Sequence, residues 1–131
     1  MVLNPINQHN IQANTLQNSP DRLKAEADIA ALIKDFDALE KAIEDGNVTE
    51  IDQAKKAILA DTNALSAILK SSKDFSANEI NAINGLIANI QDIVEFYPDS
   101  YFIDHKDEAL IECGLIQGKA TEILASLEHP N

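Results

Sequence analysis

The chain has 131 residues, of which 22 are acidic and 10 are basic, so its formal net charge is −12. Apolar residues make up 45 %, which is enough to build the core of one globular domain. The acidic balance argues against a nucleic-acid surface and an anionic membrane surface, because both bind clustered Lys and Arg. We therefore expect a soluble protein whose partners are neither nucleic acids nor membranes.

Transport signals and disulfides receive no support from the sequence. No segment approaches the roughly 18 consecutive apolar residues of a membrane-spanning helix. The N-terminus lacks the basic and apolar regions of a cleaved signal peptide. Cys113 is the sole cysteine and has no partner for an internal disulfide, which fits a reducing compartment. We predict a protein that is cytoplasmic, or exported without a cleaved signal peptide.

Residues 1–19 differ from the rest of the chain. They contain eight Asn and Gln residues and no Asp, Glu, Lys or Arg. Their apolar residues are too widely spaced for a helical stripe, so we predict a flexible, disordered polar tail. Two interpretations stay open, which are plain terminal disorder and a segment for export or docking. Residues 20–129 are predicted to form a single helical-bundle domain.

The first two predicted helices cover residues 21–45 and 50–71. Ser19 is a good N-cap, Pro20 suits the first helical position, and Gly46 is a natural stop. Thr49 is the expected cap of the second helix. The apolar residues at helical spacing are, in the first helix, Leu23, Ile29, Leu32, Ile33, Phe36, Leu39 and Ile43, and in the second, Ile51, Ala54, Ile58, Leu59, Leu65, Ile68 and Leu69.

The third and fourth predicted helices cover residues 77–96 and 105–128. Ser76 and Glu79 have the spacing of a capping box, Pro98 prevents continuation of the third helix, and Asp104 is the expected cap of the fourth. Apolar residues at helical spacing are Ile80, Ile83, Leu86, Ile87, Ile90, Ile93 and Val94 in the third helix, and Ala109, Ile111, Leu115, Ile116, Ile123, Leu124 and Leu127 in the fourth.

Four helices of similar length joined by short loops are typical of an antiparallel four-helix bundle. No stretch alternates with the period of two that a half-buried strand requires. The fold class is therefore predicted as all-α. An intertwined dimer of helical hairpins is the main alternative arrangement.

The predicted loop 96–102 carries four of the six aromatic residues beside several acids. Tyr and Phe on a turn make good interface anchors, and they also cap the end of a bundle core. We expect Phe96 and Phe102 to point inward and the two tyrosines outward. The predicted partner-binding residues are Tyr97, Asp99, Tyr101, Phe102 and Asp104.

Gly114 and Gly118 lie four residues apart inside the fourth predicted helix. Each glycine in a helix interior costs about 1 kcal/mol relative to alanine, so something should compensate. We predict that another helix packs closely against them, either within the bundle or across an interface with a second copy of the chain.

Metal binding and catalysis find no specific motif. His105, Glu108 and Glu112 can share one helical face, but a di-iron bundle requires His and Glu on several helices. Cys113 and His105 are eight residues apart, about 12 Å along a helix, so they form no nucleophile–base pair. There is no glycine-rich phosphate loop. We predict no enzyme, metal or cofactor.

Negative charge is concentrated in the C-terminal part of the chain. Residues 76–131 hold ten acidic residues against Lys106 and Lys119. This excess either keeps the protein soluble or attracts a partner with a basic surface. We predict a non-enzymatic protein–protein interaction module.

Three versions of that function remain open. The Asn- and Gln-rich, charge-poor N-terminus resembles the uncleaved leader of bacterial type III secretion substrates, which implies a secreted virulence factor or regulator. An acidic immunity or antitoxin-type inhibitor of a basic toxin or nuclease is the alternative. A homo-oligomeric scaffold subunit is the third.

Overall fold

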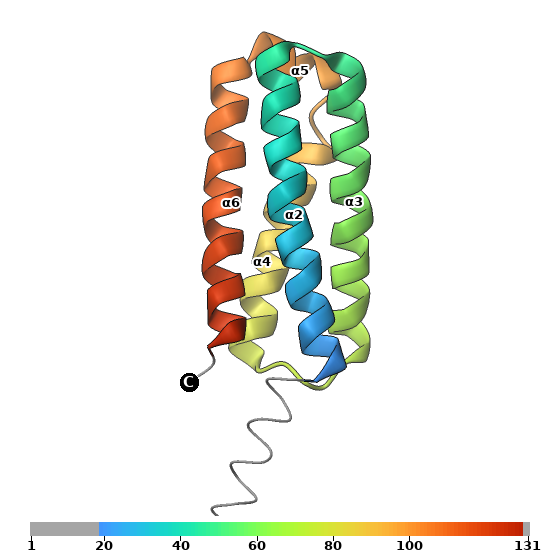
Figure 1. The fold of residues 1–131 in the computed structure, drawn as a ribbon, viewed down its shortest axis with the longest axis vertical. Coiled ribbons are helices and arrows are strands. Elements are labelled where there is room, and N and C mark those ends of the chain that lie inside the picture. The colour runs from blue at the N-terminus through green and yellow to red at the C-terminus, as the bar shows by residue number, and fades with distance from the viewer. Residues whose placement is uncertain (1–18, 130–131) are drawn as a thin grey trace, which may run out of the picture.

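The computed structural model describes residues 19–129. The helices in this range are α2 (Pro20–Asp45), α3 (Val48–Ser71), α4 (Ala77–Val94), α5 (Asp99–Asp104) and α6 (Lys106–Glu128). Figure 1 shows the four long helices side by side, with the short α5 at one end. The predicted all-α bundle is confirmed, and each long helix begins and ends within two residues of its predicted range. Residues 1–18, which make up almost all of the predicted polar tail, lie outside the described residues.

Contacts at one end of the bundle give the direction of each helix. Arg22, near the start of α2, contacts Glu79 at the start of α4 and Leu127 at the end of α6. It also contacts Asp74, which follows α3. Helices α2 and α4 therefore run one way and α3 and α6 the other (Figure 1).

Several helix ends follow the sequence signals. The Ser19 hydroxyl accepts a hydrogen bond from the Arg22 backbone N–H at 3.1 Å. Gly46 has φ 65°, a left-handed conformation that glycine adopts without strain. Ser76 and Glu79 exchange the two hydrogen bonds of the predicted capping box.

Other boundaries correct the sequence prediction. Asn47 replaces Thr49 as the cap of α3, and its Oδ1 accepts from the Glu50 N–H at 3.1 Å. The predicted cap Asp104 is the last residue of α5, and α6 instead follows His105, whose side chain makes no capping bond. The predicted loop before α6 thus contains six helical residues. Their local pattern is too short to predict a helix, and it is their packing on the core that holds them.

The core follows an alternating spacing of three and four residues, as in packed helical bundles. In α2 this series comprises Arg22, Ala25, Ile29, Leu32, Phe36, Leu39 and Ile43. In α6 it comprises Ala109, Cys113, Ile116, Ala120, Ile123 and Leu127. Many α6 members are small, which allows α2 and α6 to lie close together.

Three residues of the predicted apolar stripes are exposed instead. Leu23 is 49 % exposed, Ile111 is 65 % exposed and Leu115 is 70 % exposed. The smaller Ala25 and Cys113 occupy core positions that the prediction gave to larger neighbours. The prediction assigned the largest apolar side chains to the core. The regular spacing of three and four residues instead places the smaller Ala25 and Cys113 there.

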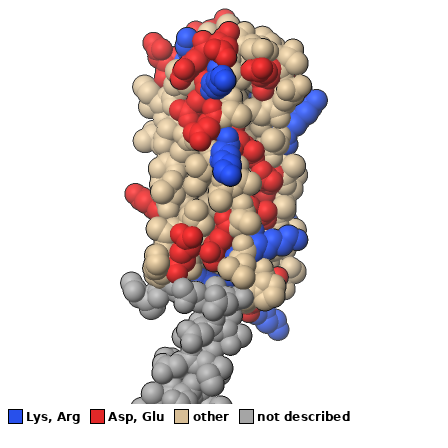
Figure 2. Space-filling view, viewed as in Figure 1, with Lys and Arg blue, Asp and Glu red and all other residues tan. Residues whose placement is uncertain are grey.

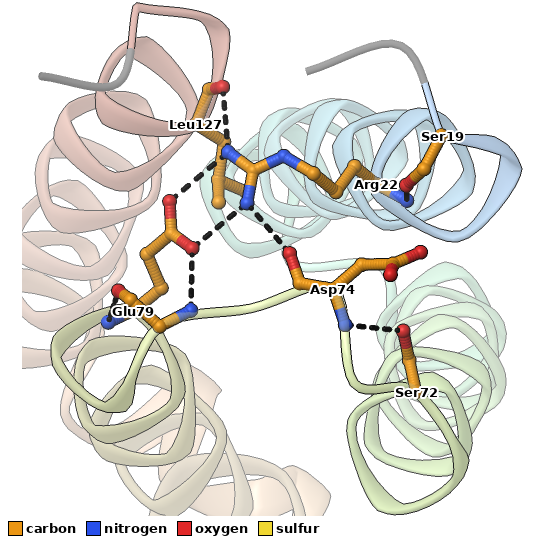
Figure 3. A network of polar contacts seen from close by, with 7 residues as sticks. Ser19, Arg22, Ser72, Asp74, Glu79 and Leu127 are labelled. Carbon is orange, nitrogen blue, oxygen red and sulfur yellow. Dashed lines mark hydrogen bonds and ion pairs between the residues drawn. The ribbon is translucent and has the colours of Figure 1, made fainter. Parts of the chain in front are cut away.

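Arg22 is a buried charge, 3 % exposed, at the end of the bundle where α2 begins (Figure 3). Its two terminal nitrogens donate to both carboxylate oxygens of Glu79, at 2.8 and 3.0 Å. They also donate to the backbone oxygens of Asp74, at 3.1 Å, and Leu127, at 3.0 Å. The guanidinium carbon lies 5.6 Å from the centre of the Phe75 ring. One side chain therefore joins α2, α4, α6 and the loop between α3 and α4.

Candidate functional site

The aromatic segment after α4 packs around the end of the bundle. The rings of Tyr97 and Tyr101 stack with centroids 4.0 Å apart, and His105 stacks on Tyr101 at 4.9 Å. Both tyrosines are half-buried. Phe102 contacts both tyrosines edge-on from beneath and is fully buried.

Lys55 of α3 fixes α5 against the bundle. Its ammonium group donates to the Asp99 carboxylate at 2.8 Å and to the Tyr97 backbone oxygen at 3.0 Å. It also lies 5.4 Å from the centre of the Phe102 ring. The carboxylate of Asp99 is therefore already paired within the chain.

These contacts revise the predicted partner-binding residues. Phe102 is 0 % exposed and contributes to the core, so its predicted role at a protein surface is wrong. Phe96, which was expected to point inward, is 72 % exposed. Tyr97 and Tyr101 are half-buried, and Asp104 is exposed, so these three remain near the surface.

A cavity of about 350 Å³ lies beside Tyr97, between α4 and α6. Its lining residues are Asn89, Asp92, Ile93, Tyr97, Glu112, Leu115, Ile116 and Lys119. A second cavity, of about 270 Å³, lies between the same helices nearer the Arg22 end, lined by Asn78, Glu79, Ala82, Ile123, Ser126 and Leu127. We call these two cavities together the α4–α6 groove.

Glu112 stands at one wall of the larger cavity. Its Oε1 accepts from the Tyr101 hydroxyl at 3.5 Å. Its Oε2 is buried and has no hydrogen-bond partner among the described residues. Burial and the charge of Glu112 raise the pKa of Tyr101, so the phenol stays protonated and able to donate.

Gly114 and Gly118 face outward on α6. A Cβ atom added at either position would meet no atom of another element within 4 Å. Close packing of a helix on these glycines within the bundle, as predicted, is therefore wrong, since they lie on the side of α6 away from its partners. Their predicted contact with a second copy stays a prediction.

The acidic surface extends beyond α6. In Figure 2, acidic side chains follow the middle of the face where α2 lies, with a few basic side chains among them. Partial burial and neighbouring carboxylates raise the pKa values of Glu26, Asp28 and Glu40. The structure thus places acids close to one another as well as on the surface.

Cys113 is inaccessible. It is fully buried, and burial with the nearby charges of Glu40 and Glu112 raises its thiol pKa to about 12. A thiol in this environment is a poor nucleophile. Within residues 19–129, no three His, Cys, Asp or Glu side chains are grouped to hold a metal ion.

Comparison with protein-family models, curated proteins and solved structures finds no match. The function is therefore inferred from the groove and its surroundings.

None of the helices in the described range is both long and apolar enough to cross a membrane.

The sequence-based prediction missed Ile111 and Leu115 as surface residues. A signal for them was present, because Ala109, Cys113 and Ile116 keep the alternating four- and three-residue spacing, whereas Ile111 and Leu115 fall outside it. Two sets of positions in α6 have helical spacing. The set with the smaller side chains is the one that is buried.

Proposed function

We propose that this chain is a non-enzymatic protein–protein interaction module that binds a basic partner through its α4–α6 side. The observation that carries the proposal is the exposure of large apolar side chains beside the groove. Leu115 lines the groove at 70 % exposure, and Ile111, one helical turn away on α6, is 65 % exposed. Exposed apolar groups of this size, close together and rimmed by polar residues, are typical of protein contact surfaces.

Charge supports a basic partner. The third and fourth long helices and the segment between them lie within residues 76–131, which hold ten acids and two lysines. One of these lysines, Lys106, donates to the Glu44 backbone oxygen at 3.2 Å. Such a field accelerates association with a positively charged protein and weakens as salt rises.

An acidic inhibitor of a basic toxin or nuclease is the version of this function that the charge favours. The version in which the chain is a type III-like secreted factor rests on residues 1–19, almost all of which lie outside the described range. Both versions place the protein in the cytoplasm or export it without a cleaved signal peptide.

Site-specific photo-cross-linking in extract from the native source tests the proposal. A photoreactive residue replaces Leu115 in one sample and Val48 in the control. Val48 is 51 % exposed at the start of α3, away from the groove. We expect position 115 to capture a defined basic protein that position 48 does not, with less capture at high salt. The same products from both positions, or none from position 115, would contradict the proposed function.

A further inference from the structure

The two cavities of the α4–α6 groove lie at different levels between the same two helices. The larger cavity lies at the Tyr97 end and reaches Lys119, and the smaller one begins about one helical turn further along α6, at Ile123. Helix α2 packs much more extensively against α3 and α6 than α4 packs against either neighbour. The α4–α6 side is therefore less tightly packed than the contacts of α2, and a helix is the kind of segment that docks along such a side.

The outer face of α6 beside this groove alternates large and small residues. Ile111, Gly114, Leu115 and Gly118 have the i, i+3, i+4, i+7 spacing of one helical face. The two large side chains are exposed, and the space above both glycines is open. The side chains of Ile111 and Leu115 are therefore available to a helix that docks at this edge of the groove.

Acidic groups surround this apolar face. Glu108 lies three residues before Ile111, and Glu122 lies four residues after Gly118, so both belong to the same face of α6. Asp92 of α4 and Glu112 of α6 line the larger cavity, with Lys119 as the one basic residue of that lining. Glu112 Oε2 also lacks a donor among the described residues, and a Lys or Arg side chain would provide one.

We propose that the α4–α6 groove binds an amphipathic helix of a partner protein, with apolar residues on one face and Lys or Arg on its flanks. A second copy of the chain does not fit equally well, because it would bring another strongly acidic surface against the first. The assignment rests on the proposed function, and it adds the structure and charge of the bound segment.

The test uses three synthetic peptides of about 20 residues, which is about 30 Å of helix. The first has Leu and Ala on one face and Lys on the flanks, the second replaces Lys by Glu, and the third shuffles the Lys peptide so that its apolar face is lost. Binding to the full chain is measured by fluorescence anisotropy, and the site is mapped from amide chemical shifts. We expect the Lys peptide to bind at least tenfold more tightly than either control, with shifts along α4 and α6.

Matched variants locate the site on the protein. Leu115→Asn removes an exposed apolar contact and is expected to weaken binding of the Lys peptide about tenfold or more. Leu23→Asn makes the same change at an exposed position of α2 and should leave binding unchanged. Circular dichroism and urea unfolding check that both variants keep the fold.

Each other outcome overturns the assignment. Equal binding of the Lys and Glu peptides removes the charge argument, and equal loss in the two Asn variants removes the groove. Self-association in sedimentation experiments that is abolished by Leu115→Asn would identify a second copy as the occupant. If a protein cross-links at position 115 but the Lys peptide does not bind, the helical assignment fails while the proposed function survives.

Discussion

Charged groups have different surroundings at the Arg22 end of the bundle and at the larger cavity of the α4–α6 groove. Arg22 is nearly inaccessible, yet its terminal nitrogens meet two carboxylate oxygens and two backbone oxygens (Figure 3). In the groove, Glu112 has a buried oxygen without a donor, and the apolar Leu115 faces solvent. The charge of Arg22 is balanced by Glu79 within the chain, although its Nε has no hydrogen-bond partner among the described residues, whereas Glu112 Oε2 meets no donor there.

Groups that stabilise the fold differ in their surroundings from groups that are available to a partner. A buried charge that is paired with an opposite charge of the same chain contributes to the folded state. An exposed apolar group beside an unpaired acceptor adds little to folding and is available for binding. Substitutions in the two regions should therefore change different measured quantities.

The largest expected effect is on stability, from Arg22→Met. This change keeps much of the side-chain length but leaves the half-buried Glu79 without its cation, and it removes donors from two backbone oxygens. Removal of one member of a buried pair costs about 3–5 kcal/mol, so the free energy of unfolding should fall by about that amount. Urea unfolding followed by circular dichroism measures it.

An exposed ion pair provides the control. Lys56 pairs with Asp52 at 3.0 Å on the surface of α3, with side-chain exposures of 76 % and 45 %. Lys56→Met should change stability by less than about 0.5 kcal/mol, as exposed pairs contribute little. If Arg22→Met costs no more than this control, the Arg22 network does not hold the end of the bundle together.

Replacement of two different glycines by alanine should change the stability of the fold in opposite directions. Gly114 lies within α6 with open space above it, so Gly114→Ala should stabilise the fold by about 1 kcal/mol. Gly46 has φ 65°, and Gly46→Ala should destabilise the fold by about 1 kcal/mol because alanine is strained there. Thermal and urea unfolding of both variants measure the difference.

Gly114→Ala also tests whether this position affects binding as well as stability. If the glycine serves close approach of a partner helix, Gly114→Ala raises stability while weakening binding of the Lys peptide. A variant that is more stable and binds equally well would show that the open space above Gly114 has no role in docking.

Local signals in the sequence predicted most of the fold. Ser19, Gly46 and the Ser76–Glu79 capping box act within a few residues, so their roles are readable without tertiary structure. Asn47 and Thr49 are both acceptable caps two residues apart, and the sequence pattern does not decide between them. Element boundaries were therefore accurate to within two residues.

The candidate site was predicted less well, because it depends on tertiary packing. Phe96 and Phe102 are chemically identical, yet one is 72 % exposed and the other is fully buried. The difference comes from α5, a helix of six residues that turns Phe102 beneath the stacked tyrosines and against Lys55. No short-range pattern specifies that turn, and the groove itself joins residues of two helices distant in sequence.

The pairing of Arg22 with Glu79 was also not predictable from the sequence. Arg22 belongs to the buried series of α2, and its partner Glu79 is 57 residues away. The sequence shows an arginine in the first turn of a helix and a glutamate in a capping box. The Glu79 side chain both caps α4 and pairs with Arg22. This double role follows from the way the helices pack.

The last expected effect depends on pH and concerns Asp35, on the side of the bundle where α2 and α3 pack closely. Burial, a hydrogen bond with Asp61 and the charge of Asp61 raise the pKa of Asp35 to about 7. The folded state therefore holds a proton that the unfolded state releases near the ordinary pKa of about 3.9. The contribution of Asp35 to stability is therefore highest below that value, falls as pH rises, and reaches its lower level once Asp35 ionises in the folded state above about pH 7.

Asp35→Asn should remove this penalty, so the variant should gain more stability over the wild type at pH 8 than at pH 5. Solvent screening of this partly exposed group reduces the expected gain at pH 8 to about 1 kcal/mol. Asp45→Asn, at the exposed end of the same helix, is the control for a general reduction in negative charge. An equal gain at both pH values, or the same pH dependence in the control, would assign the effect to net charge and not to the Asp35–Asp61 contact. A larger gain at pH 8 for Asp35→Asn alone would show that even the closely packed side of the bundle keeps acidic groups together at a cost in stability.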